Sequence, residues 1–271
     1  MLTKATPSDQ TGRAGSTDPA LVVCGLSKSF GENRILDGID LSVDAGSVVA
    51  LIGANGTGKS TLLRCLVRLI EPSAGTIHAL GREVTKLDRA SLATYRSRVG
   101  FVFQRHNLVP RLSALTNVVH GVQSRARGPR TWLQSLARSE VREEAMACLD
   151  AVGLAHVARQ SAESLSGGQS QRVAIARMLM QRPELILADE PDASLDPRAG
   201  EEVMGLLNRL AKSQKLVLVL ISHHMEHAIQ FSDRIVGLSG GRASLDVPSS
   251  SADPAALRHF FNARSRRDER S

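Results

Sequence analysis

Gly53-Ala54-Asn55-Gly56-Thr57-Gly58-Lys59-Ser60 is a glycine-rich turn that ends in Lys-Ser. An apolar run, 48–52, precedes it, and apolar residues recur at helical spacing from 62 to 70 after it. Every fixed position of G-x-x-x-x-G-K-[ST] is filled, between an expected strand and an expected helix, as a phosphate-binding loop requires. A chance glycine-rich turn before a helix is the alternative, and the flanking pattern disfavours it.

Such a loop suits a nucleotide. Its glycines let successive backbone N–H groups turn inward around phosphate oxygens, and the positive end of the next helix adds to the attraction. Lys59 is expected to neutralise the β- and γ-phosphates, and the Ser60 hydroxyl to bind Mg²⁺. The residues expected to bind nucleotide here are Gly53, Ala54, Asn55, Gly56, Thr57, Gly58, Lys59, Ser60 and Thr61.

Two acidic residues, Asp189 and Glu190, end the apolar run 185–188. Carboxylates at the carboxyl end of a parallel strand face the ligand-binding edge of a doubly wound sheet. We expect Asp189 to hold Mg²⁺ through water, and Glu190 to polarise the attacking water as a general base. The alternative is a solvated acidic turn.

Composition narrows the class of protein. The 271 residues fit one large domain, or one domain with a subdomain. A net charge of +7 invites nucleic-acid or anionic-membrane binding, but aromatic residues are only 3% of the chain, so a solvated basic surface is the preferred interpretation. The three cysteines form no C-x-x-C pair, which argues against a zinc site or a disulfide framework. No apolar run approaches the ~18 residues of a membrane span.

The order of elements predicts an α/β fold. Apolar runs at 185–188 and 216–221 flank an expected helix from about Pro197 to Lys212, with Asp196 as its N-cap. Residues 1–19 are polar and are expected to be a disordered tail. Residues 105–180 have a helical character and are expected to be an insertion into the α/β core.

Five further motifs surround the loop in a fixed order. They are Phe30, upstream of the loop; Gln104, after Phe101-Val102-Phe103; Leu165-Ser166-Gly167-Gly168-Gln169; Ser194-Leu195-Asp196; and His223, after the run 216–221. With these motifs, residues 20–245 resemble the ATP-binding cassette (ABC) ATPases. The resemblance implies an α/β P-loop NTPase core, an antiparallel β-subdomain and a helical subdomain at about 105–180 that contains the signature motif, 165–169. Residues 246–271 would then form a short C-terminal helix and a basic tail.

The resemblance also implies roles for the motif residues. Phe30 would stack on adenine, Gln104 would bind Mg²⁺ and sense the γ-phosphate, and His223 would steady the γ-phosphate and the attacking water. The signature lies away from the P-loop of its own chain, so it would reach ATP bound to a second copy in a head-to-tail dimer. The residues that would make this contact are Ser166, Gly167, Gly168 and Gln169.

Three features depart from the family pattern or extend it. Asp192 stands close to Glu190, and we expect it to point to solvent; the alternative is that it raises the pKa of Glu190. His224 follows His223, and a surface histidine is favoured over a metal ligand. A cluster at 264–270, with four arginines, is expected to be a disordered basic tail, and attraction to anionic lipid is the minor alternative.

The cargo is inferred from resemblance alone. Residues 105–121, the segment around Trp132 and residues 188–197 resemble the ATP-binding subunits of phosphonate importers. This implies a bacterial importer with two copies of this chain, membrane permease subunits and a periplasmic binding protein. The chain would lie at the cytoplasmic face of the inner membrane, held by the permease, without nucleic acid. The alternatives are import of another anion or a polar amino acid, or a non-transport cassette protein that belongs to a carbon–phosphorus-cleaving complex or acts on nucleic acid.

Overall fold

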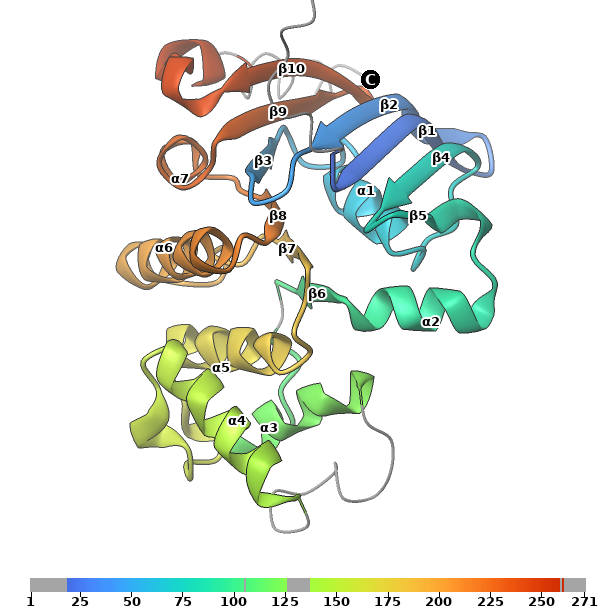
Figure 1. The fold of residues 1–271 in the computed structure, drawn as a ribbon. Coiled ribbons are helices and arrows are strands. Elements are labelled where there is room, and N and C mark those ends of the chain that lie inside the picture. The colour runs from blue at the N-terminus through green and yellow to red at the C-terminus, as the bar shows by residue number, and fades with distance from the viewer. Residues whose placement is uncertain (1–18, 105, 126–136, 259, 261–271) are drawn as a thin grey trace, which may run out of the picture.

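The computed structural model describes residues 19–104, 106–125, 137–258 and 260. Two sheets organise this part of the chain (Figure 1). One has six strands in the order β10-β9-β3-β8-β7-β6, and the other has four in the order β2-β1-β4-β5. The polar segment 1–18, the arginine-containing link at 126–136 and the basic cluster at 264–270 lie outside the described residues.

The six-stranded sheet is parallel except at one edge. Its strands are β3 (Val48–Ile52), β6 (Val99–Val102), β7 (Leu185–Asp189), β8 (Val217–Ile221), β9 (Arg234–Ser239) and β10 (Arg242–Pro248). Only β10 runs antiparallel to its neighbour, β9. Strands β3, β7 and β8 are buried at every residue, which explains their continuous apolar sequences. The strands predicted at 48–52, 185–188 and 216–221 are confirmed within one residue at each end.

The four-stranded sheet is antiparallel. It contains β1 (Leu21–Phe30), β2 (Asn33–Val43), β4 (Ala74–Ala79) and β5 (Arg82–Glu83). Helix α1 (Lys59–Leu66) shares one apolar cluster with residues of both sheets. The antiparallel subdomain implied by the family resemblance is therefore present, and it packs beside the helix that the glycine-rich loop opens.

Helices α3 (Ala114–Val119), α4 (Ser139–Ala151) and α5 (Gly167–Leu179) form one packed group at the end of the molecule away from the antiparallel sheet (Figure 1). Helix α5 also packs on β6 and on α6 (Pro197–Gln214), which joins the group to the large sheet. Two further helices are α2 (Arg89–Ser97) and α7 (Met225–Phe231). In its described part, the segment 105–180 contains helices α3, α4 and α5 and no strand.

Local chemistry accounts for the start of α6. The Asp196 side chain accepts a hydrogen bond from Ala199 N, and Pro197 occupies the first turn of α6, as predicted.

Residues 254–258 are helical, in keeping with a short C-terminal helix, and Leu257 there is buried. Among the described residues no helix is both long and apolar enough to cross a bilayer.

Candidate functional site

The glycine-rich loop follows β3 and opens α1, and two of its glycines are required by close packing. Gly53 has φ +143°, and a Cβ there would lie 2.4 Å from the Leu238 carbonyl oxygen. Gly58 has φ +96°, and a Cβ there would lie 2.7 Å from Leu36 Cδ2. A side chain at either position would force the loop away from β2 or β9. The loop is therefore held against the sheets at these two glycines.

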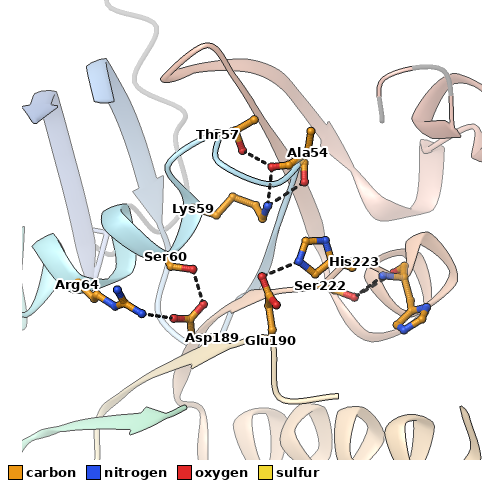
Figure 2. Close-up of polar contacts among 11 residues, drawn as sticks. Ala54, Thr57, Lys59, Ser60, Arg64, Asp189, Glu190, Ser222 and His223 are labelled. Atoms are coloured by element: carbon orange, nitrogen blue, oxygen red, sulfur yellow. Dashed lines mark hydrogen bonds and ion pairs between the residues drawn. The ribbon is translucent and has the colours of Figure 1, made fainter. Parts of the chain in front are cut away.

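Lys59 lies at the centre of the loop. Its Nζ donates to the carbonyl oxygens of Gly53 at 2.8 Å and Ala54 at 2.9 Å, and the residue is only 4% exposed (Figure 2). Burial lowers the pKa of Lys59 because it penalises the charged ammonium, while the nearby carboxylates of Glu190 and Asp189 act in the opposite direction. A buried cation of this kind is well placed to bind anionic oxygens.

Ser60 and Asp189 meet across the gap between α1 and the end of β7. The Ser60 hydroxyl donates to Asp189 Oδ1 at 2.7 Å, although the two residues are 129 positions apart (Figure 2). Arg64 Nη2 lies 3.5 Å from Asp189 Oδ2. A hydroxyl and a carboxylate are hard oxygen ligands, and Mg²⁺ is usually bound by one or two such protein groups together with phosphate oxygens. The pair fits that donor set.

Glu190 and His223 form the second contact of the site. His223 Nε2 lies 2.5 Å from Glu190 Oε1, and both side chains are partly exposed (Figure 2). Glu190 has φ +52°, a left-handed conformation that is unfavourable for a residue with a Cβ. Strain of about 1–3 kcal/mol at such a residue persists only where the surroundings hold it in place. The carboxylate of Glu190 is therefore aimed by the loop that follows β7.

A cavity of about 270 Å³ brings together Phe30, part of the glycine-rich loop and Glu190. It is lined by Phe30, Ile35, Asn55, Gly56, Gly58, Lys59, Ser60, Thr61 and Glu190. Phe30 ends β1 and is 51% exposed, with the Lys28 ammonium 4.7 Å from its ring centroid. An exposed aromatic ring beside a phosphate loop suits the stacking of a nucleotide base.

Gln104 lies at the same edge of the sheet and is exposed. Val102 of β6 pairs with Ala188 of β7, so Gln104 and Glu190 each lie two residues beyond paired positions. The register therefore places Gln104 at the same edge of the sheet as Glu190. It is not among the residues that line the 270 Å³ cavity.

The signature motif forms the N-terminus of α5. Ser166 Oγ accepts a hydrogen bond from Gln169 N at 3.2 Å, and Gln169 Oε1 accepts one from Ser166 N at 2.9 Å. This reciprocal capping box was missed at the sequence level, although Ser-x-x-Gln before an apolar helix is its known signal. None of residues 165–169 lines the cavity formed around Lys59. Within one chain, the signature does not join the loop.

The expectation that Asp192 points to solvent is wrong. Asp192 is buried, and its Oδ2 lies 2.7 Å from His227 Nδ1 on α7. A histidine 35 positions away supplies a polar partner inside the protein, so the carboxylate need not face water. His224 is exposed, with its ring centroid 5.0 Å from that of His227. No cluster of three metal-binding side chains of the His, Cys, Asp or Glu type occurs among the described residues.

A P-loop on a largely parallel sheet, flanked by an antiparallel sheet and a helical group, defines a nucleotide-hydrolysing cassette. The chain belongs to the ABC transporter family, whose sequence pattern matches residues 36–193. It therefore binds ATP and is an ATP hydrolase. The resemblance to the ABC ATPases that the sequence motifs indicated is confirmed.

Two relatives are similar along most of their length. The "Phosphonates import ATP-binding protein PhnC" of Frankia casuarinae is 47% identical over 84% of this chain and 90% of its own. The "Phosphate-import ATP-binding protein PhnC" of Mycolicibacterium smegmatis is 47% identical over 86% of this chain and 88% of its own. A solved dimer of the ATP-binding cassette MJ0796 in a post-hydrolysis state, bound to ADP and Pi, aligns with a TM-score of 0.74. It is 34% identical, covering 84% of this chain and 98% of that one.

Proposed function

We propose that the chain is the ATP-hydrolysing subunit of a bacterial importer, and that its cargo is a phosphonate. The assignment of the cargo is supported by the 47% identity, over 84% of this chain, to a relative named for phosphonate import. The second relative, equally identical, is named for phosphate import, so inorganic phosphate is the second candidate. Both cargoes are phosphorus oxyanions. Of the alternatives that the sequence left open, import of another anion is therefore favoured over import of a polar amino acid.

The site residues divide the work of hydrolysis. Lys59 neutralises the β- and γ-phosphates, and the loop residues 53–61 hold the phosphate oxygens with their backbone N–H groups. Ser60, Asp189 and Gln104 hold Mg²⁺, which supplies charge neutralisation when it is bound. Glu190 takes a proton from the attacking water at its carboxylate, and His223, 2.5 Å away, orients that carboxylate and the γ-phosphate. Phe30 stacks on the adenine.

The working unit is a head-to-tail dimer. The signature residues Ser166, Gly167, Gly168 and Gln169 contact the γ-phosphate bound to the P-loop of a second copy. Two observations support this arrangement. Ser166 and Gly167 are exposed at the start of α5, and the signature lies outside the cavity of its own chain. A similar cassette has been solved as a dimer.

The membrane partner is a permease that docks between the large sheet and the helical group. A groove of about 710 Å³ runs along α2, β6 and α5, and its apolar lining includes Leu69, Phe101 and Phe103. Leu69 is 53% exposed, an unusual position for a large apolar side chain. Phe103 directly precedes Gln104, so a partner in the groove touches the segment that reaches the ATP site. The chain is thereby held peripherally at the cytoplasmic face of the inner membrane, and cargo reaches the permease from a periplasmic binding protein.

Growth on defined phosphorus sources tests the cargo. A strain that lacks this chain is supplied with a phosphonate or with phosphate as its sole phosphorus source. Loss of growth on phosphonate alone is expected, with rescue by the wild-type chain but not by Lys59→Ala. Loss on phosphate alone favours the second candidate. Unchanged growth on both sources, in a strain whose other phosphorus importers are deleted, overturns the proposal.

A further inference from the structure

A second carboxylate–imidazole pair lies beside the first. Glu190 pairs with His223, and two residues along the same loop Asp192 pairs with His227 at 2.7 Å. Both pairs join the segment after β7 to the segment after β8. The first is partly open to solvent, whereas the Asp192 side chain is 1% exposed and that of His227 is 15% exposed.

Burial of the second pair has an unfavourable free energy. Asp192 Oδ1 is buried and has no hydrogen-bond partner among the described residues, so the bond to His227 is the one satisfied interaction of this carboxylate. A buried carboxylate with an unsatisfied oxygen is destabilising, and such groups in folded proteins require a specific explanation. Because the remaining interaction is a single bond between two elements, its effect is to fix one element against the other.

Packing on α6 tightens the same junction. A Cβ on Gly200, in the first turn of α6, would lie 3.4 Å from Asp192 Cβ and 3.7 Å from His227 Cε1. The β7–α6 loop, α6 and α7 therefore meet closely at this pair. Farther along the loop, Leu195 Cδ2 lies 3.3 Å from the Cβ position of Gly167 in the signature. One short segment thus connects Glu190, the buried pair and the signature helix.

We infer that Asp192 and His227 are positioning residues for hydrolysis: their hydrogen bond fixes the loop after β7 on α7 and so aims the Glu190 carboxylate. The left-handed backbone of Glu190, φ +52°, needs such an anchor, because the strain would otherwise relax by moving the carboxylate. The P-loop contributes no residue to the pair, so ATP binding is independent of it. This inference rests on the proposed role of Glu190 as the base.

The test separates turnover from binding. Asp192→Leu keeps the branched shape of the side chain and removes the hydrogen bond. His227→Leu removes the same hydrogen bond from the other side. In the purified chain and in its complex with the permease, each is expected to lower kcat tenfold or more, within the roughly hundredfold loss that a 1 Å misplacement can cause. The KM for ATP is expected to stay unchanged. Asp192→Asn, whose amide oxygen still accepts from His227, is expected to retain most of the turnover.

Two double-mutant cycles test whether Asp192 acts through its bond to His227 and through Glu190. Asp192→Leu with His227→Leu is expected to lower kcat no further than the more severe single change, since both remove one bond. In a Glu190→Gln background, Asp192→Leu is expected to have no further effect on residual hydrolysis. Equal fractional losses in the wild-type and Glu190→Gln backgrounds would mean a general defect and would overturn the inference.

A matched control guards against simple loss of stability. Glu144 in α4 bonds Arg125 at 2.9 Å and Arg182 at 2.8 Å, in the helical group away from the site. Glu144→Leu is expected to lower thermal stability while kcat stays at the wild-type value. Unchanged kcat in Asp192→Leu, with Glu190→Gln inactive, overturns the positioning role alone. Wild-type turnover in Glu190→Gln overturns the proposed base, and with it the inference.

Discussion

Lys59 Nζ and the Gly53 carbonyl oxygen are 2.8 Å apart, so the lysine closes the loop to which it belongs. Replacement by alanine removes the buried ammonium and its charge-assisted bonds. We expect Lys59→Ala to weaken ATP binding at least tenfold, since a hydrogen bond to a charged group contributes about 1.5–3 kcal/mol. Hydrolysis is expected to be abolished. Titration with ATP by calorimetry measures the first effect, and release of phosphate the second.

Lys212→Ala is the control for this change. Lys212 bonds Asp233 at 2.5 Å beyond the other end of the sheet and is half exposed. Its loss removes one positive charge from the same protein without touching the loop. ATP affinity equal to wild type is expected. Equal weakening in both variants would show that net charge, rather than the Lys59 contact, determines the affinity.

Glu190→Gln separates binding from hydrolysis. The amide keeps the size of the side chain and its contact with His223, but it cannot take a proton from water. Turnover is expected to fall by about 10²–10⁴-fold, the range for loss of a general base. ATP binding is expected to persist, so a stable ATP-bound dimer accumulates and is visible by size-exclusion chromatography with light scattering. Turnover at the wild-type rate would mean that Glu190 is not the base.

Shared sites predict complementation between two inactive variants. Lys59→Ala damages the P-loop, and Gly168→Asp places a carboxylate where the signature meets phosphate. Each homodimer is expected to be inactive. Mixing the two chains gives dimers with one intact and one doubly defective site, because each site takes its loop from one chain and its signature from the other. Recovery of ATPase activity on mixing supports the shared site; none, despite measured mixed dimers, contradicts it.

The three cysteines predict a pattern of reactivity. Cys24 is exposed, whereas burial raises the pKa of both Cys65 and Cys148 to about 11. At pH 8 we expect one thiol to react rapidly with a thiol reagent in the native protein and all three after unfolding. Cys24→Ser removes the rapid phase. Three rapid thiols in the native protein would contradict the burial of Cys65 and the partial burial of Cys148.

The same pKa shifts give a sign for stability at alkaline pH. Between the ordinary thiol pKa of 9.0 and about 11, the folded state holds protons that the unfolded state releases. The free energy of unfolding is therefore expected to fall as pH rises through this window. Cys65→Ala, measured against wild type by urea denaturation, is expected to show a smaller decline. An equal decline in both proteins would assign the alkaline loss to other groups.

Sequence patterns predicted the parts of the site that are local in the chain. The loop 53–60 could be predicted because its glycines and Lys-Ser follow a buried strand, and buried parallel strands are continuous apolar runs. Asp196 could be assigned as an N-cap because Pro197 and an amphipathic helix follow it. In each case the physical cause lies within a few residues of the signal, so the motif and the structure coincide.

Contacts between distant residues could not be predicted in this way. Asp192 and His227 are 35 positions apart, and nothing in either neighbourhood marks one as the partner of the other. Similarly, Arg177 of α5 donates to the carbonyl oxygens of His106 and Asn107, some 70 residues away. Polar pairs of this kind depend on how helices and loops that are distant in the sequence pack against one another, which periodicity does not specify. The wrong expectation for Asp192 has this origin.

In the proposed head-to-tail dimer, the capping box at the start of α5 has a consequence for the speed of closure. Ser166 Oγ already accepts from Gln169 N, so one of its two lone pairs is engaged while its hydroxyl hydrogen can still be donated. The side chain thus arrives at a partner with its rotamer fixed and its donor exposed. Little conformational entropy is then lost when two chains meet, because the helix has ordered the serine beforehand. A short helix cap thereby makes each encounter between two ATP-loaded chains more productive.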